Sequence, residues 1–333
     1  MPTLLSSLAL MTLLGAGSSP TTAAVAAAPE VWADRLPGFA AHAAPRFVVL
    51  SDLGAERTDQ IAEVLERTAD AVESFARSRG SSSDKTRTAH RPILCIAFAE
   101  RDAFERFARE HDRIDAGWMM GYWAAADERI VVRATTPPQR SANDQRSVNT
   151  QRSAADAQPL LDMTHPCETM ATVAHEAAHQ MLHRLGLQRA SPRMPLAMLE
   201  GLAMQFESCA SADGIAFAAQ PRRERRLVER SDAMPGLRLL LTTPRMPSME
   251  PADIERFYDA SWSLVRFLHE RDPDALADYL ATLVAESETL TRTRLITLFE
   301  RRFGPTGAVE AAWLRWMRGV SDGASGASRR PKE

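Results

Sequence analysis

Hydrophobic and polar positions alternate in two different ways along the first third of the chain, which predicts strands and helices in turn. Residues 46–51 and 92–98 are short, nearly continuous apolar runs, as expected of buried strands. Between them, residues 56–78 repeat their apolar side chains every three or four positions, which is typical of an amphipathic helix. A second helix is expected around residues 102–110, and residues 121–133 have the pattern of a β-hairpin.

The pattern after residue 160 is almost entirely helical. Apolar residues at helical spacing fill residues 170–182 and 195–207, with a short loop between them, and recur in residues 255–269. Three further amphipathic segments predict a small C-terminal bundle: residues 274–285, 291–303 and 308–320. In the last of them Trp313 and Trp316 share a face, and we expect them to anchor the packing. Together the patterns predict an α+β fold, a mixed sheet followed by a mainly helical half.

The expected organisation has five parts. A stretch poor in apolar residues and rich in Gln, Arg, Ser and Asn separates the two patterns and predicts a flexible loop. The parts are a signal peptide (1–28), an N-terminal α/β subdomain (29–134), the flexible loop (135–162), a helical subdomain (163–320) and a disordered tail (321–333).

The first 28 residues have the composition of a cleaved secretory signal. Their apolar part is too short to span a bilayer, and Ala-x-Ala sites follow it. We therefore expect export to the periplasm or the extracellular space, with no stable membrane span after cleavage. No Lys or Arg precedes the apolar part, which leaves an uncleaved anchor as the alternative.

The composition of the chain bears on its partners and on its cysteines. The 333 residues carry 40 basic and 43 acidic side chains that are interspersed, so no basic face for nucleic acid is expected. The three cysteines are an odd number for an exported chain. Cys167 and Cys209 lie at the outer ends of the two apolar helices, where a disulfide is feasible, whereas Cys95 is expected to be a buried free thiol.

The candidate chemistry lies in the first of these helices, as His175-Glu-Ala-Ala-His179. Two histidines four residues apart leave the same helix face one turn apart, so both imidazoles can bind one Zn²⁺. Glu176 lies about 100° round the helix, where its carboxylate can reach a water molecule on the metal. This is the arrangement of a general base in a zinc peptidase.

The second apolar helix supplies a third candidate ligand, Glu200. Two helices joined by a short loop can pack antiparallel, which would bring Glu200 opposite the histidines. His183 is expected only to continue the helix face of His179. For Glu207 two interpretations are open, a hydrogen bond to a ligating histidine or a solvated helix end, and the pattern favours the second.

His-Glu-x-x-His followed about twenty residues later by Glu200-Gly-Leu-Ala resembles the gluzincin metallopeptidases, the clan of thermolysin and the aminopeptidase N type. In the latter the third-ligand helix reads Trp-Leu-Asn-Glu-Gly-Phe-Ala, so the Glu-Gly-x-Ala core matches here and the Trp and Asn do not. A later helix of that type begins Tyr-Glu-Lys-Gly-Ala, and Tyr258-Asp-Ala-Ser261 is similar. The resemblance implies that Tyr258 stabilises the oxyanion; a core tyrosine is the alternative.

The resemblance also implies a place for the substrate. In gluzincins the last strand of the sheet runs along the cleft and pairs with extended substrate, which makes residues 130–133 the candidate edge strand. An ordinary sheet strand is an equally acceptable interpretation. The charge-dense residues 221–230 are expected to form a solvated helix face, although an Arg there could hold a substrate carboxylate if it bordered the cleft.

We therefore expect an exported zinc peptidase with one Zn²⁺ per chain, which acts on a peptide or protein. Aminopeptidases of the related type bind the substrate amine through a Gly-x-Met-Glu-Asn-like segment, and Gly117-Trp-Met-Met-Gly121 has no Glu there, which favours an endopeptidase. The alternative is a non-catalytic exported domain that binds protein or cell-envelope partners. A helical scaffold with an accidental motif would leave Glu200 and Tyr258 unexplained. The sequence does not indicate an oligomeric state.

Overall fold

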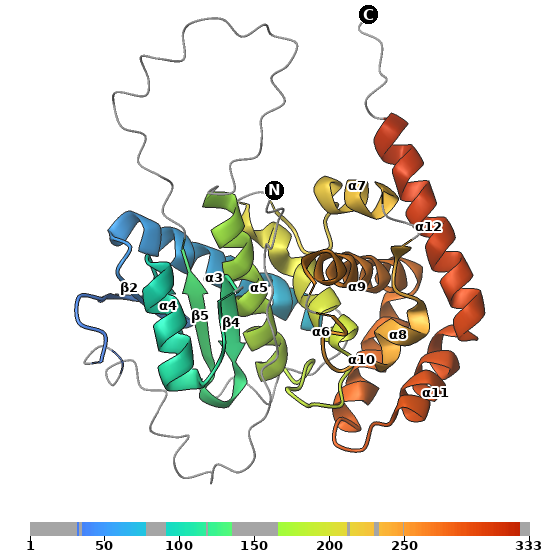
Figure 1. Cartoon of the computed structure of the whole chain (residues 1–333), viewed down its shortest axis with the longest axis horizontal. Coiled ribbons are helices and arrows are strands. Elements are labelled where there is room, and N and C mark those ends of the chain that lie inside the picture. The colour runs from blue at the N-terminus through green and yellow to red at the C-terminus, as the bar shows by residue number, and fades with distance from the viewer. Residues whose placement is uncertain are drawn as a thin grey trace, which may run out of the picture.

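The computed structural model describes Trp32 and residues 35–77, 91–117, 119–134, 166–211, 214–229, 233–248 and 250–326. Its N-terminal half contains a mixed five-stranded sheet (Figure 1). The central strands run parallel, and an antiparallel strand closes each edge. In spatial order the strands are β1 (Ala40–Ala43), β2 (Phe47–Ser51), β3 (Ile93–Phe98), β5 (Arg129–Arg133) and β4 (Gly121–Ala124).

Helices cover both faces of this sheet. Alternate residues of each strand point to opposite faces, so Val49 and Cys95 join one core and Leu50 and Ile96 the other. The first core lies under α3 (Ala55–Arg77) and α5 (Pro166–Arg184). The second lies under α4 (Arg101–Phe107), whose end continues as a π-helix over Ala108–Asp112. The order of strands and helices predicted for this half is confirmed, with β1 as an addition.

The predicted edge strand is wrong. Residues 130–133 belong to β5, which lies inside the sheet between β3 and β4. A 3₁₀ turn at Ala125–Asp127 folds the hairpin so that its first strand, β4, forms the edge. Strand order depends on which neighbour each strand finds in space, and the pattern of a single hairpin does not contain that information.

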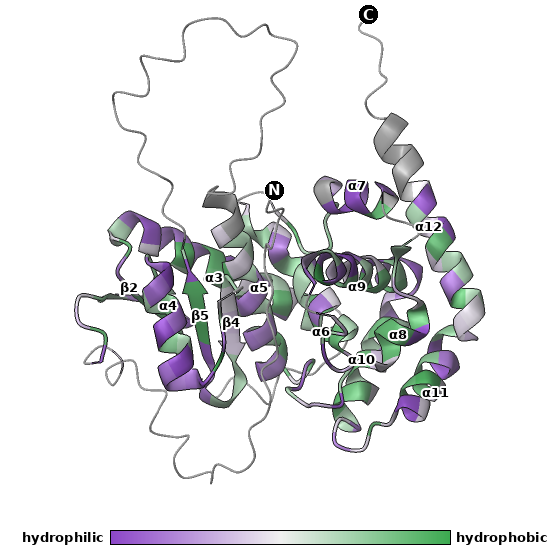
Figure 2. Ribbon diagram, in the orientation of Figure 1, coloured by the Kyte–Doolittle hydropathy of each residue, from purple (hydrophilic) through white to green (hydrophobic). Residues whose placement is uncertain are grey.

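The C-terminal half is helical, and α5 lies between it and the sheet (Figure 1). The short helices α6 and α8 are largely apolar, whereas α7 is strongly hydrophilic (Figure 2). Beyond α5 the order is α6 (Leu196–Ala203), the 3₁₀ segment Met204–Ala210, α7 (Pro221–Glu229), α8 (Leu237–Thr242), α9 (Pro251–Arg271), α10 (Pro273–Ala285), α11 (Arg292–Phe303) and α12 (Thr306–Gly326).

One continuous hydrophobic core joins this half to the face of the sheet that α3 and α5 cover. Its largest buried side chains include Trp262 of α9 and Trp313 of α12. The indole of Trp313 donates a hydrogen bond of 3.2 Å to Ser263, and Trp316 packs against the same core. The two tryptophans of α12 therefore act as packing anchors, as predicted.

Two predicted boundaries change. The apolar segment at residues 195–207 is not one helix, because α6 ends at Ala203 and a 3₁₀ segment follows. Helix α12 continues to Gly326, so the predicted disordered tail does not begin at residue 321. Between the start of this helix and Pro331 the sequence contains no proline that would end it earlier.

Several other predictions lie outside the described residues, namely the signal peptide at 1–28, the loop at 135–162 and the last part of the tail. Within the described part of the chain, no helix combines the length and the apolar composition needed to cross a bilayer.

Candidate metal centre

Three predicted ligands meet in the core, between α5 and α6. One ligand atom from each of His175, His179 and Glu200 lies within 4.8 Å of the others, and all three side chains are buried. The Nε2 atoms of the two histidines are 3.1 Å apart, and Glu200 Oε2 lies 3.2 Å from His175 Nε2. Two imidazoles and one carboxylate that converge in this way could hold a metal ion.

Helix α6 presents Glu200 from a fully enclosed position. All eight residues of the helix are buried, and the backbone N–H of Leu196 at its start donates to the carbonyl oxygen of Thr243 at 2.9 Å. A helix enclosed on all sides can be apolar all round, as this one is apart from its glutamate. Glu200 therefore lies in the core because its helix is anchored there.

The second ring nitrogen of His175, Nδ1, which does not face Glu200, has a carboxylate partner of its own. His175 Nδ1 lies 3.1 Å from Glu207 Oε1, and Arg223 donates to the other oxygen of Glu207 at 2.5 Å. The expectation of a solvated helix end for Glu207 is wrong, because the 3₁₀ segment packs along α5 and leaves this side chain only 9% exposed. The alternative interpretation, a hydrogen bond to one of the candidate ligand histidines, agrees with the structure.

The corresponding nitrogen of His179, Nδ1, lies beside a side-chain amide instead of a carboxylate. Gln188 Nε2 lies 2.7 Å from His179 Nδ1, and the indole of Trp123 stands parallel to the His179 ring with 5.8 Å between centroids. Trp123 belongs to the edge strand β4, and its Nε1 donates to Gln180 at 2.6 Å. His183 lies next to Trp123 but outside the ligand group, as predicted.

The candidate ligands shift one another's pKa values. Burial alone lowers the pKa of His175, but hydrogen bonds to Glu200 and Glu207 and the charge of Glu176 raise it to about 10. Burial raises the pKa of Glu200, whereas the charge of His179 and hydrogen bonds to both histidines lower it to about 2. Without a metal, the cluster therefore holds a proton on imidazole beside an ionised carboxylate.

Glu176 stands apart from these pairs. Its side chain is completely buried, and within the described part of the chain neither carboxylate oxygen has a hydrogen-bond partner. Burial raises its pKa to about 7, although the charges of His175 and His179 act in the opposite direction. A buried carboxylate without a partner is costly, and such groups in native proteins commonly mark a functional site.

Tyr258 of α9 completes the set of predicted residues. It is 4% exposed, and burial, the charges of Glu200 and Glu176, and a hydrogen bond to Glu200 all raise its pKa well above the usual range. The phenol is therefore a neutral hydrogen-bond donor beside the ligands. The structure brings all five candidate residues together, from α5, α6 and α9.

The charge-dense residues 221–230 form the predicted solvated face only in part: Arg225 and Glu229 are exposed, whereas other side chains of α7 pack against the protein. Arg223 and Arg226 of α7 both donate to Asp259 of α9, and Leu227 is buried. Sequence reasoning missed Asp259 and Gln188 entirely. Asp259 lies inside the Tyr258-Asp-Ala-Ser261 segment, but nothing in that segment assigns it a role. Only the packing of distant elements brings these two residues to the site.

The cysteines give a mixed result. Cys95 is a buried free thiol, as predicted, and burial raises its pKa well above the usual range. Cys209 is also a free buried thiol, which does not agree with a disulfide to Cys167. The side chain of Cys167 lies outside the described residues.

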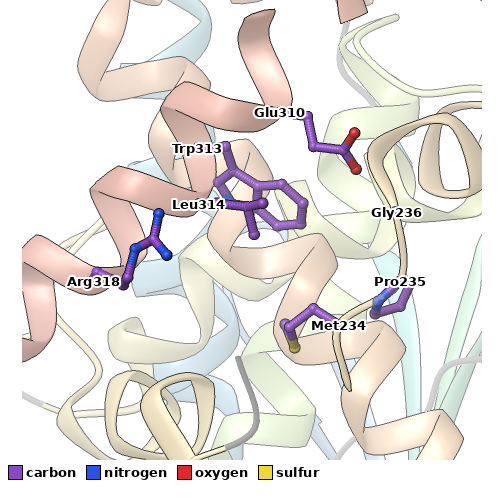
Figure 3. Close-up of a pocket in the computed structure, with 7 residues that line it drawn as sticks. All are labelled: Met234, Pro235, Gly236, Glu310, Trp313, Leu314 and Arg318. Atoms are coloured by element: carbon purple, nitrogen blue, oxygen red, sulfur yellow. The ribbon is translucent and has the colours of Figure 1, made fainter. Parts of the chain in front are cut away.

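A cavity of about 280 Å³ lies elsewhere in the helical half (Figure 3). Met234, Pro235 and Gly236 form one side, and α12 forms the other with Glu310 and the two apolar side chains Trp313 and Leu314. No residue of the metal cluster lines this cavity. It is therefore separate from the candidate centre.

A family model matches the part of the chain that contains the candidate metal centre. Residues 169–289 match the model of a family described as a protein of unknown function, DUF1570. This range contains the three candidate ligands together with Glu176 and Tyr258. No curated protein matches the chain.

Proposed function

We propose that this protein is a zinc-dependent peptidase that hydrolyses peptide bonds with Glu176 as general base. The observation that carries the proposal is the position of Glu176: a fully buried carboxylate without a hydrogen-bond partner among the described residues, next to a His, His and Glu cluster. A site that only binds metal has no use for such a group, because an unpaired buried carboxylate lowers stability.

The donor set fits zinc. Imidazole nitrogen and carboxylate oxygen are ordinary zinc ligands, and sites with two histidines and one glutamate leave a fourth position open for reaction. His175 has an acceptor for its outer nitrogen, as ligating histidines usually do. When bound, Zn²⁺ supplies Lewis-acid chemistry: it polarises a carbonyl group and makes water more acidic.

The chain's own residues would handle protons and charge. Glu176, with a pKa of about 7, can take a proton from the attacking water and pass it to the leaving amine. Tyr258 stays protonated, so its hydroxyl can donate a hydrogen bond to the carbonyl oxygen as negative charge develops there. Its hydrogen bond to Glu200 keeps the phenol beside the candidate ligands, which supports this role.

An extended substrate could bind along the edge of the sheet. The edge strand is β4, and Trp123 on this strand contacts His179 and donates to Gln180. An extended peptide that paired with β4 would therefore run past the ligands. Gly117-Trp-Met-Met-Gly121 contains no acidic residue to bind a substrate amine, which supports cleavage within a chain. We further propose export, from the composition of residues 1–28.

The test combines metal content with hydrolysis. The purified mature chain, Glu200→Ala and a His183→Gln control are analysed for zinc and incubated with a mixed peptide library. We expect about one zinc per chain and chelator-sensitive cleavage in the wild type and the control, with both lost in Glu200→Ala. Zinc without cleavage would favour a binding domain, and no zinc in the wild type would exclude the proposal.

A further inference from the structure

We propose that Arg223 of α7 is a positioning residue of the metal centre, which orients His175 through Glu207 and ties Tyr258's helix to the same point through Asp259. This inference rests on the metal site of the proposed function. It assigns a task to α7, a helix that contains none of the ligands.

Each of the three guanidinium nitrogens of Arg223 donates a hydrogen bond. Its Nη2 donates to Glu207 Oε2 at 2.5 Å, its Nη1 to Asp259 Oδ1 at 3.3 Å and its Nε to Gln220 Oε1 at 2.7 Å. The planar guanidinium group holds its donors in fixed directions, whereas the three donors of a lysine ammonium rotate about one compact charge. Arg223 therefore joins the 3₁₀ segment, α7 and α9 at one point.

The two oxygens of Glu207 divide between two partners. Oε2 receives the arginine, and Oε1 faces Nδ1 of His175 at 3.1 Å. A carboxylate there accepts the Nδ1 proton, so Nε2, which faces Glu200, is the nitrogen left to bind the metal once zinc displaces its proton. Without Arg223 the carboxylate would lose its only described cationic partner apart from His175, and its rotamer would no longer be set from both sides.

Asp259 extends the connection to the proposed oxyanion donor. It follows Tyr258 in α9 and is 2% exposed. Arg226 also binds it, through Nε at 2.7 Å and Nη2 at 2.6 Å. Both arginines therefore attach α7 to α9, but only Arg223 also reaches Glu207. This difference separates support of the metal site from simple attachment of a helix.

Three variants of one helix test the proposal: Arg223→Gln, Arg226→Gln and Arg225→Gln. The side chain of Arg225 is exposed, and Arg225→Gln removes the same charge from the same helix. This variant is therefore the matched control. Zinc affinity is measured by competition with a chromophoric chelator, and stability by urea unfolding of the metal-free protein. We expect Arg223→Gln to bind zinc at least tenfold more weakly, the usual effect of losing an outer partner of a ligand.

The other variants define what a structural role would do. Arg226→Gln should lower the urea midpoint about as much as Arg223→Gln but weaken zinc binding by less than threefold, and Arg225→Gln should change neither. Cobalt replaces zinc in a second measurement, in which the visible absorption of the bound ion should change in Arg223→Gln alone. Arg223→Lys should recover part of the zinc affinity, because it keeps the charge but loses the fork.

The outcomes are distinct. If the wild type binds zinc and Arg223→Gln binds it equally well with an unchanged cobalt spectrum, Arg223 has no positioning role and the zinc site stands. If the wild type binds no zinc, the proposed function is wrong, and the positioning role of Arg223 is wrong as well. Should Arg223→Gln not fold, Arg223→Lys and Glu207→Gln provide the comparison, and equal zinc affinity in both and the wild type would overturn the proposal.

Discussion

Gly201 lies so close to Ser261 that the two helices carrying them touch through their backbones. A Cβ atom at position 201 would lie 2.4 Å from the carbonyl oxygen of Ser261 and 2.7 Å from a methyl group of Val265. Gly201 directly follows the ligand Glu200 in α6, and Ser261 is one turn beyond Tyr258 in α9. The absence of a side chain at 201 thus sets the distance between the helix of the third ligand and the helix of Tyr258.

Gly201→Ala should therefore separate α6 from α9. The backbone oxygen of Ser261 cannot move away as a side chain could, so the overlap should cost about 3 kcal/mol of unfolding free energy, the upper part of the range for overpacked cores. Urea unfolding of the metal-free protein measures this change. Zinc affinity should fall as well, because Glu200 moves with α6.

The control for this change is Gly319→Ala in α12, where nothing lies within 4 Å of the added atom. There alanine should stabilise the helix by up to about 1 kcal/mol, because glycine is the weaker helix former. A Gly201→Ala protein as stable as the wild type would mean that α6 and α9 are not packed as described.

Glu176→Gln should separate metal binding from hydrolysis. Glutamine has the same size but cannot take a proton from water, so peptide hydrolysis should fall by about 10²- to 10⁴-fold. Zinc should remain, since Glu176 is not one of the converging ligands. Stability should not decrease, because the change removes a buried carboxylate without a hydrogen-bond partner. Retention of hydrolysis in this variant would assign the general base to another group.

The ligand helices illustrate what the sequence can predict. The spacing of His175 and His179 is local, and their helix brings them to one face whatever surrounds it. Glu200 is predicted because two apolar helices joined by a short loop can pack antiparallel, whereas Tyr258 is predicted only through a resemblance of short motifs. The positions of all four could be predicted because each lies in a strongly patterned helix.

Residues brought in by packing could not be predicted in this way. Arg223 and Asp259 are 36 positions apart, and their pairing depends on how α7 rests against α9. Glu207 was assigned to solvent because a single helix would have ended there, whereas the chain changes to a 3₁₀ segment after Ala203. The edge strand was misplaced for the same reason, as strand order is a property of the assembled sheet.

Zinc binding should release a proton at neutral pH. The pKa of His175 in the metal-free protein is raised to about 10, above the ordinary 6.5, because Glu200 and Glu207 outweigh burial. Zinc must displace that proton, so affinity should rise about tenfold per pH unit between pH 7 and 9. Calorimetry in two buffers of different ionisation enthalpy counts the protons released.

Stability of the metal-free protein should change in the opposite direction. A group whose pKa is raised by folding stabilises the protein below its unfolded pKa and loses this effect as pH rises through the folded pKa. For His175 the contribution is therefore complete below pH 6.5 and declines towards pH 10. Melting temperatures that rise over this window would contradict a protonated His175.

Gln188 should select its orientation when the metal binds. If His179 ligates through Nε2, its Nδ1 carries the ring proton and needs an acceptor. The structure places Nε2 of the amide 2.7 Å from Nδ1, while the amide oxygen is buried without a hydrogen-bond partner in the described part of the chain. Rotation of the side-chain amide by half a turn would give Nδ1 an acceptor and the amide oxygen a partner. We therefore expect the oxygen to face His179 in the zinc form.

Two substitutions of similar size test this orientation. Gln188→Leu offers no acceptor and should weaken zinc binding about tenfold, whereas Gln188→Glu offers only acceptors and should stay within about threefold of the wild type. Chelator competition measures both values, and urea unfolding shows whether either change acts through stability. Equal zinc affinity in the leucine and glutamate variants would mean that His179 does not use Gln188 as an acceptor, and that its ligating nitrogen is oriented by the stacked ring of Trp123 instead.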